Sequence, residues 1–483
     1  MKIFIILIFI LTSIEFNMAQ TNFPQTIYEN YIKYKSSEFD KKNFTHRDLK
    51  SSIEKLKLDK KFKVEVAGKS LEGREIYLLS IGKGKTNVLL WSQMHGDEST
   101  ATMALFDIFN FFNSNDDLKN LRKEILDSLK IYFIPMLNPD GAEKYQRRNA
   151  LDIDLNRDAL RLQFPESQIL KTLRDSLNPK FAFNLHDQST RYTSGKSYKS
   201  ATISFLAPTY NYEKEINDVR ANTMKLIVNI SDALNNFIPG HIAKYSDDFE
   251  PRAFGDNFIK WGTSSVLIES GGWKNDNEKQ FVRKLNFVAI LSGLLSIAQK
   301  SYKNADLEKY HSIPFNDKLL FDVLLKNLTI SKNGKDYLID VGINNEEMIS
   351  NNSDPYFISK IEDLGDLSIF YGYEEFDLSG CEIKKSQIFI ANDSNLAKFN
   401  FAELIKNGVG FIKLKNIPNV SDFRKFPMNL ILNENDIDLE PGYQKNANFT
   451  IWKNEKLVYN VINGFIYNLE SGIKNYGNGI IFK

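Results

Sequence analysis

Four short apolar segments, each followed directly by polar residues, constrain the fold of this 483-residue chain more than any other feature. They are Asn87–Met94, Ile131–Leu137, Phe181–Leu185 and Ser264–Ile268. Their length and apolar composition predict buried strands, and the apolar residues after the first one, from Ala101 to Phe112, recur at helical spacing. In open α/β sheets, ligand sites form just past the carboxyl ends of the strands. The sequence therefore predicts an α/β fold in which four polar clusters meet at one crevice.

The polar residues at these strand ends have the composition of a catalytic zinc site. His95 follows the first segment, Glu98 opens the helix after it, His186 ends the third segment and Glu269 ends the fourth. Such a site uses three protein ligands, leaves the fourth position to water and adds a separate carboxylate that takes the proton. A His-x-x-Glu pair alone is weak evidence, because most histidines are ordinary surface or core residues. Four unrelated loops, however, would not supply a complete ligand set.

Six short motifs resemble those of a known family, the zinc metallocarboxypeptidases related to pancreatic carboxypeptidases A and B. In chain order they are MHGDES (Met94–Ser99), NPDG (Asn138–Gly141), RRN (Arg147–Asn149), DIDLNRD (Asp152–Asp158), NLHDQ (Asn184–Gln188) and IESGG (Ile268–Gly272). The resemblance spans Phe62 to Ala298, and it is specific because all the motifs occur in the family's order. It implies a mixed, mostly parallel central sheet that is flanked by helices.

The resemblance also implies roles for the metal-binding residues. His95, Glu98 and His186 match the ligands of one zinc ion per chain. Glu269 matches the general base that activates the metal-bound water. These roles agree with the zinc chemistry inferred from the residue types themselves.

Three further residues resemble the family's substrate-binding groups. Arg147 resembles the arginine that polarises the scissile carbonyl, and Asn156 and Arg157 resemble the pair that binds the free C-terminal carboxylate. Guanidinium groups suit both tasks, because they pair bidentately with carboxylates and can meet charge that develops in the transition state. The family's mobile tyrosine has no clear counterpart. Tyr245 is the nearest candidate, unless its ring is a packing group, in which case Arg252 is a substitute hydrogen-bond donor.

The N-terminal residues have the features of a secretory signal. Lys2 precedes the apolar run Ile3–Ile14, and Met18-Ala19-Gln20 indicates cleavage after Gln20. The run is too short to span a bilayer, which takes about 20 residues, so an uncleaved anchor is the less favoured alternative. We therefore predict a signal peptide over residues 1–20 and a secreted or periplasmic protein with no integral membrane segment after cleavage. The single cysteine, Cys381, rules out an intrachain disulfide.

Charge and length bound the partners and the number of domains. The 62 basic residues nearly balance the 61 acidic ones, so nothing indicates nucleic acid or an anionic membrane as a partner. The length exceeds what one catalytic domain needs, and we predict a catalytic domain over residues 21–305 and a β-rich accessory domain of unknown role over residues 314–483. Turn signals such as Asn333-Gly334 separate apolar stretches in the second part. The apolar run Leu285–Ala298 is expected to be a buried helix that closes the first domain.

The residues and the resemblance together predict a zinc-dependent exopeptidase that removes C-terminal amino acids from peptides with a free C-terminus. Both protein fragments and cell-wall peptides are candidate substrates. One alternative is an amidohydrolase of small N-acyl amino acids in the same superfamily, which the NPDG and RRN motifs disfavour. Another is a non-catalytic surface protein that binds peptides or glycans, which the presence of the base Glu269 disfavours.

Overall fold

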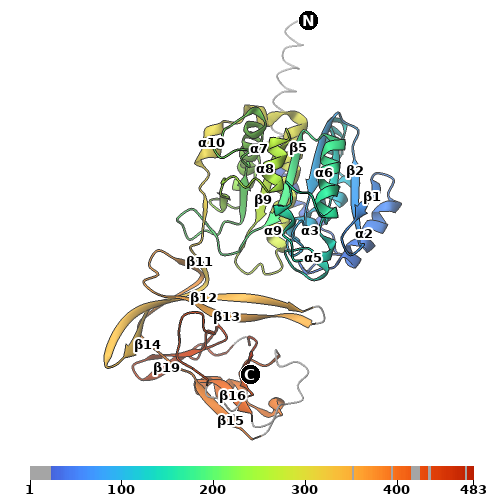
Figure 1. The fold of residues 1–483 in the computed structure, drawn as a ribbon. Coiled ribbons are helices and arrows are strands. Elements are labelled where there is room, and N and C mark those ends of the chain that lie inside the picture. Colours follow the sequence, from blue (N-terminus) through green and yellow to red (C-terminus); the bar gives the residue numbers. More distant parts are fainter. Residues whose placement is uncertain are drawn as a thin grey trace. The chain divides into compact units, whose positions relative to one another are not determined.

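The computed structural model describes residues 23–350, 353–392, 395–414, 425–432, 437–473 and 476–482. The chain divides into two compact units, one that ends at Lys318 and one from Leu319 to Lys483 (Figure 1). The predicted signal peptide, residues 1–20, lies outside the described residues. The predicted domain limits, 21–305 and 314–483, stay predictions.

The first unit is built around a mixed sheet of eight strands in the order β1-β2-β4-β3-β5-β9-β7-β8. Its strands are β1 (Lys63–Lys69), β2 (Glu75–Ile81), β3 (Thr86–Trp91), β4 (Leu129–Ile134), β5 (Phe181–Asp187), β7 (Ile203–Leu206), β8 (Ile242–Lys244) and β9 (Ser264–Ser270). The pairs β3–β4, β3–β5, β5–β9 and β7–β8 are parallel, and β1–β2, β2–β4 and β7–β9 are antiparallel. The predicted mixed, mostly parallel sheet is confirmed, and the four predicted segments are its neighbouring strands β4, β3, β5 and β9.

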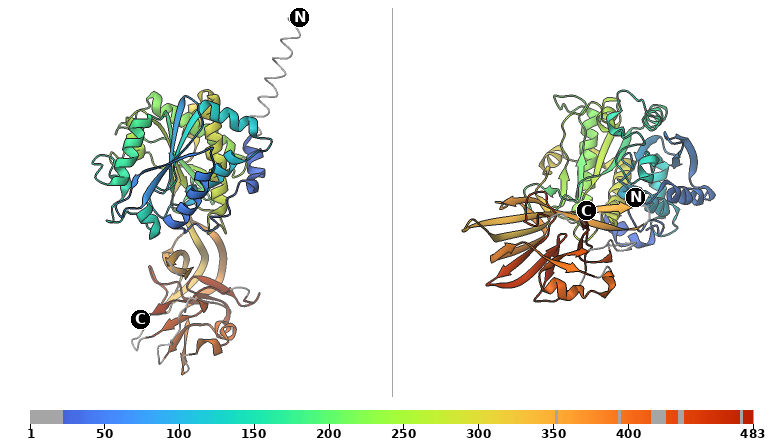
Figure 2. Two further views of the ribbon diagram at one scale, coloured as in Figure 1. Left: turned by 90° about the vertical axis from the view of Figure 1, so that its right-hand side faces the viewer. Right: turned by 60° about the horizontal axis from the view of Figure 1, so that its bottom comes forward.

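Helices cover both faces of this sheet, as Figure 1 and Figure 2 show. They are α2 (His46–Leu58), α3 (Thr100–Asn113), α4 (Lys119–Ser128), α5 (Pro139–Glu143), α6 (Pro165–Leu177), α7 (Asp218–Asn235), α8 (Phe254–Lys260), α9 (Gln280–Gln299) and α10 (Leu307–Ser312), with the short 3-10 helices η1 (Tyr31–Lys33), η2 (Leu155–Arg157) and η3 (Ser301–Asn304). Helices α3, α4, α7 and α9 share one core with Val88 and Leu90 of β3. Helices α6 and α8 share the other core with Leu89 and Trp91. The central strands β3, β5 and β9 are mostly apolar because both of their faces are buried.

Helix α9 is the predicted buried helix. It is apolar and long enough to cross a membrane by length and composition, but 83% of its most apolar stretch is buried inside the protein. Fifteen of its residues, including Arg283 and Asn286, are buried. The prediction of a buried helix over Leu285–Ala298 is therefore confirmed.

The segment after α9 remains part of the first unit. Tyr302 and Tyr310 lie in its main core, and the Tyr310 hydroxyl accepts a hydrogen bond from the backbone N–H of Ala207 at 3.1 Å. Strand β10 (Asn316–Asp317) then pairs with β6 (Thr193–Ser194). Packing and strand pairing within the first unit therefore extend as far as β10.

The second unit contains two sheets. One has the order β13-β12-β11-β14-β18-β19-β20, and the other has the order β15-β16-β17-β21 with only parallel pairs. The elements are β11 (Leu320–Lys332), β12 (Lys335–Ser350), β13 (Ser353–Gly365), β14 (Tyr371–Lys384), β15 (Gln387–Ala391), η4 (Leu396–Lys398), α11 (Phe401–Lys406), β16 (Val409–Leu414), β17 (Asn429–Ile431), β18 (Phe449–Lys453), β19 (Lys456–Ile462), β20 (Phe465–Asn468) and β21 (Ile481–Phe482). Asn333 and Gly334, with φ values of 54° and 74°, form the predicted turn between β11 and β12. The predicted β-rich C-terminal module is confirmed.

Candidate active site

Four neighbouring parallel strands carry the predicted site residues to one edge of the sheet. Strand β3 leads into the loop with His95, and β4 leads into the turn that begins at Asn138. His186 lies in β5 and Glu269 lies in β9, where the two residues are direct partners in the strand register. Both strands extend two residues further than the sequence predicted. His186 and Glu269 are therefore held by the sheet rather than by loops.

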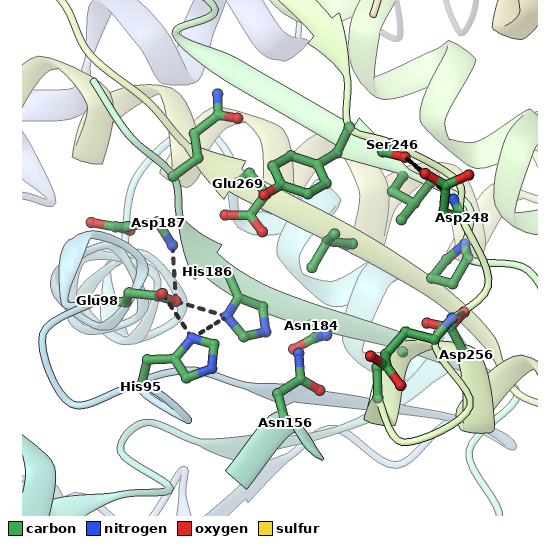
Figure 3. A pocket seen from close by; sticks show the side chains of 18 of the residues that line it. His95, Glu98, Asn156, Asn184, His186, Asp187, Ser246, Asp248, Asp256 and Glu269 are labelled. Carbon is green, nitrogen blue, oxygen red and sulfur yellow. Dashed lines mark hydrogen bonds and ion pairs between the residues drawn. The ribbon is translucent and has the colours of Figure 1, made fainter. Parts of the chain in front are cut away.

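His95, Glu98 and His186 form a compact buried cluster in which the three side chains point toward one another (Figure 3). One ligand atom from each lies within 4.8 Å of the others. The Nδ1 atoms of the two histidines are 3.1 Å apart, and each lies 2.7 Å from an oxygen of Glu98. Two ligands of a tetrahedral zinc ion lie about 3.3 Å apart. The donor set and its spacing therefore fit zinc.

Charges within this cluster shift the pKa values of its members in opposite directions. Burial lowers the pKa of His95, but the carboxylates of Glu98 and Asp154 outweigh burial and raise it to about 9. Burial holds the pKa of His186 below its usual range, although Glu98 opposes this shift. Burial raises the pKa of Glu98, but His95 and His186 outweigh burial and lower it. Glu98 is therefore an anion, as a carboxylate that binds a metal must be. A metal at this cluster would displace a proton from His95.

Asp154 orients His95 from the side opposite the cluster. Its Oδ1 accepts a hydrogen bond from His95 Nε2 at 3.1 Å, which leaves the Nδ1 atom for a metal. Carboxylates in this position fix the tautomer and the ring orientation of a metal-binding histidine. Sequence reasoning did not single out Asp154. The signal was its place in the DIDLNRD motif, directly before Asn156 and Arg157.

The glycine of the His-Gly-Asp-Glu motif allows two backbones to pass very close to each other. A Cβ atom on Gly96 would lie 2.1 Å from the carbonyl carbon of Gly141, so a side chain does not fit there. The Gly96 N–H also donates to the carbonyl oxygen of Arg147 at 3.3 Å. The crossing therefore ties the metal-binding loop to the loop that carries Arg147.

Arg147 connects the metal cluster to the open part of the site. Its Nη1 donates to Glu98 Oε1 at 3.0 Å, and its Nη2 donates to Asp154 Oδ2 at 3.0 Å. Its side chain is still 43% exposed. The guanidinium is thus fixed at one edge and accessible at the other.

Glu269 is half-buried and lies on the strand next to the one that carries His186 (Figure 3). Burial raises the pKa of Glu269 well above its usual range, and the charge of Glu98 raises it further. A carboxylate with a raised pKa is a better proton acceptor than an ordinary one. Its place and its environment suit a general base.

One cavity of about 400 Å³ connects these groups. It is lined by all eight residues that the sequence singled out for the site, namely His95, Glu98, Arg147, Asn156, Arg157, His186, Tyr245 and Glu269. Arg252, the alternative hydrogen-bond donor, is not among the lining residues, and its guanidinium binds both carboxylate oxygens of Glu250. The cavity has the size of a small-ligand site, for which about 300 to 1,000 Å³ is usual.

Arg157 and Glu250 face each other in the part of the cavity away from the metal cluster. Arg157 Nε lies 3.3 Å from Glu250 Oε2, with 38% and 28% of the two side chains exposed. Asn156 Oδ1 accepts a hydrogen bond from the backbone N–H of Phe254 at 2.9 Å. Glu250 was not anticipated, because an ion pair between distant segments leaves no local pattern in a sequence.

Tyr245 forms part of the cavity wall beside Glu269. Its backbone N–H donates to the carbonyl oxygen of Phe205 at 2.9 Å. Its ring meets the ring of Tyr192 edge to face, with the centroids 6.4 Å apart. Burial raises the pKa of Tyr245, and the nearby charge of Glu269 adds to the shift. The structure thus places Tyr245 where it can contact a ligand and also shows that its ring packs against a neighbour.

Known proteins were compared with this chain. Residues 50–226 match the profile of a family described as zinc carboxypeptidase, and the match ends before Tyr245 and Glu269. Carboxypeptidase D of Drosophila melanogaster is 31% identical over 130 residues, which are 23% of this chain and 9% of that protein. Carboxypeptidase 2 of Trichophyton rubrum is 25% identical over 144 residues, which are 28% of this chain and 26% of that protein. The chain thus spans 9% and 26% of the lengths of these two relatives.

Solved structures also resemble part of this chain. A metallo-carboxypeptidase from Burkholderia cenocepacia is 15% identical with a TM-score of 0.44, and the alignment covers 53% of this chain and 70% of that one. The profile match includes the three residues of the buried ligand cluster. The predicted resemblance to the zinc carboxypeptidases is therefore confirmed for residues 50–226 of the chain.

Proposed function

We propose that this protein is a zinc-dependent carboxypeptidase that hydrolyses the C-terminal peptide bond of peptides. The observation that carries the proposal is the register of β5 and β9, in which His186 and Glu269 are direct partners. With this register, a half-buried carboxylate lies beside the three-residue ligand cluster. Neither a packed core nor a simple binding surface needs a carboxylate of raised pKa at this place.

The proposed mechanism assigns one task to each group around the cluster. His95, Glu98 and His186 would hold a zinc ion, which, when bound, would lower the pKa of a water molecule and polarise a carbonyl group. Glu269 accepts the proton of the water and later donates it to the leaving amine. Arg147, which Glu98 holds in place, donates to the carbonyl oxygen as negative charge develops there.

The other part of the cavity recognises the end of the peptide. Arg157 and Asn156 bind the C-terminal carboxylate, because a guanidinium pairs with a carboxylate through two parallel hydrogen bonds. Tyr245 contacts the substrate from the wall beside Glu269. Peptides with a free C-terminus are the substrates that this arrangement favours.

The same proposal covers the setting and the extent of the catalytic domain. We propose that the protein acts in secreted or periplasmic form, because residues 1–20 have the features of a secretory signal.

We further propose that the catalytic domain extends to Lys318, because Tyr310 and β10 pack within the first unit. A chain cut after Lys318 should keep its zinc and unfold in one transition. A chain cut after Ala305 should unfold at a lower temperature, and equal unfolding temperatures would argue against the longer limit.

A peptide library tests the proposed reaction directly. The zinc-loaded full-length protein is incubated with peptides that have free C-termini and with matched C-terminal amides, and the products are identified by mass spectrometry. We expect loss of C-terminal residues from the free peptides only, abolished by chelation and restored by zinc. A strong preference for N-acyl amino acids over every peptide would support the amidohydrolase alternative. Peptide binding without turnover would support the binding-protein alternative.

A further inference from the structure

Lys279 is a buried lysine beside the site that the proposed mechanism does not use. It is 7% exposed and lies directly before helix α9 with a left-handed backbone, at φ 56°. An ammonium group is costly to bury unless acceptors surround it. Its partners therefore indicate what the residue does.

The ammonium of Lys279 contacts the ends of two neighbouring strands. Its Nζ donates to the carbonyl oxygens of Ser270 at 3.1 Å and Gly271 at 2.6 Å, which are the two residues after Glu269. The same Nζ lies 3.9 Å from Asp187 Oδ2, in the residue after His186. One side chain thus bridges the strand end with the general base and the strand end with a metal ligand.

Hydrogen bonds connect the two strand ends that Lys279 contacts to the metal cluster and to each other. The Asp187 N–H donates to Glu98 Oε2 at 3.2 Å, as the dashed line in Figure 3 shows. The Asp187 carboxylate accepts a hydrogen bond from the Thr100 hydroxyl, two residues after Glu98. The Gln188 N–H donates to the carbonyl oxygen of Ser270 at 3.0 Å. A shift of either strand end would therefore reach both Glu98 and Glu269.

The chain after Glu269 has little space in which to move. A Cβ atom on Gly271 would lie 2.0 Å from the carbonyl oxygen of Ala201, so this backbone is packed tightly on one side. Lys279 holds the same backbone through two carbonyl oxygens. An apolar side chain of similar length would fill the volume of Lys279 without burying a charge. It would, however, remove one donor from each of these carbonyl oxygens, and Ser270 would keep only the hydrogen bond from the Gln188 N–H.

We propose that Lys279 is a positioning residue that fixes the ends of β5 and β9 relative to each other, and so sets the position of Glu269 against His186. Its expected effect on turnover rests on the proposed function. Its effect on the two strand ends does not, and the test measures both.

Hydrogen exchange and kinetics of the full-length protein test the role of Lys279. Lys279→Met removes the ammonium at nearly constant size, and Lys274→Met, an exposed lysine five residues earlier, is the matched control. We expect Lys279→Met to accelerate amide exchange about tenfold within residues 181–190 and 264–273, while the rest of the first unit stays within about twofold. We also expect kcat to fall roughly 10- to 100-fold with KM within about twofold, because the base is misplaced while substrate binding is unchanged. Lys279→Arg, which keeps the charge and the donors, should recover part of the lost kcat.

The outcomes separate this proposal from the proposed function. Unchanged exchange in both segments overturns the positioning role, whatever the activity does. Accelerated exchange throughout the unit, with a lower unfolding temperature, also overturns it, because Lys279 would then only stabilise the fold. If the unmodified protein hydrolyses no peptide, the proposed function fails, and the exchange data still decide the role of Lys279. If Lys279→Met does not fold, Lys279→Gln, which keeps one donor, is measured against the same criteria.

Discussion

The two halves of the cavity differ in how their charged groups are held. His95, Glu98 and His186 are at most 7% exposed, and each is bonded to another member of the cluster. Arg157 and Glu250 are 38% and 28% exposed, and they pair across a more open part of the cavity. A buried pair is rigid because moving one member leaves an unpaired charge, whereas an exposed pair exchanges partners at little cost. The half with His95, Glu98 and His186, the metal half, is therefore preorganised. The half with Arg157 and Glu250, the substrate half, is suited to exchange the carboxylate of Glu250 for that of a peptide.

The largest expected effect is the loss of the proposed base, Glu269. Glu269→Gln keeps the shape of the side chain but cannot accept a proton. We expect kcat to fall roughly 10²- to 10⁴-fold, with zinc still bound at one ion per chain. Steady-state kinetics and metal analysis of the purified protein check this. An unchanged rate would assign the base to another residue.

A smaller effect is expected at Asp154, which contacts the cluster through His95. Asp154→Asn weakens the acceptor that holds His95 Nε2. Zinc affinity should fall by roughly 10- to 100-fold, as measured by competition with a chromogenic chelator. Asp152→Asn is the control, because Asp152 is exposed and lies two residues earlier on the same loop. Equal zinc affinity in the two variants would show that the metal half does not depend on this carboxylate.

In the substrate half, Arg157→Ala should act on recognition and leave zinc binding intact. A hydrogen bond to a charged group contributes about 1.5 to 3 kcal/mol, so kcat/KM for free peptides should fall roughly ten- to a hundredfold. The loss should be much smaller for C-terminal amides, which lack the carboxylate. Arg161→Ala, an exposed arginine on the same loop, controls for a general loss of positive charge. Equal losses on free and amidated peptides would contradict carboxylate binding by Arg157.

The sequence predicted that His95, Glu98 and His186 would lie together, because these residues follow strong local patterns. Apolar strands such as β5 and β9 are buried on both faces, and His186 and Glu269 stand at their ends. Short motifs in a fixed order were then enough to identify the three residues of the cluster. The contact between Gly96 and Gly141 shows the physical reason for one of these motifs, since two backbones meet where no side chain fits.

The partners of these residues could not be predicted in the same way. Arg157 belongs to the DIDLNRD motif, but Glu250, which meets it through the fold of a distant loop, belongs to no motif. Lys279 lies in the polar stretch WKNDNEKQ, which is typical of an exposed turn, yet tertiary packing buries its ammonium against Ser270 and Gly271. Local composition reports how polar a segment is, but not which of its side chains the fold encloses.

The smallest expected effect tests the comparison between the two halves most directly. Glu250 Oε2 lies 3.3 Å from Arg157 Nε. Hydrogen bonds from Arg252 lower the pKa of Glu250, so this carboxyl group is ionised at neutral pH. Glu250→Gln removes this internal competitor for the substrate carboxylate. Because the pair is exposed, it is worth only about 0.2 to 1 kcal/mol, and KM should fall by at most about two- to fivefold with kcat unchanged. Asp248→Asn removes a charge from the same cavity wall, where Asp248 pairs with Lys214, and should leave KM nearly unchanged. A rise in KM for Glu250→Gln would mean that Glu250 holds Arg157 in its binding position, and the substrate half would then be as prearranged as the metal half.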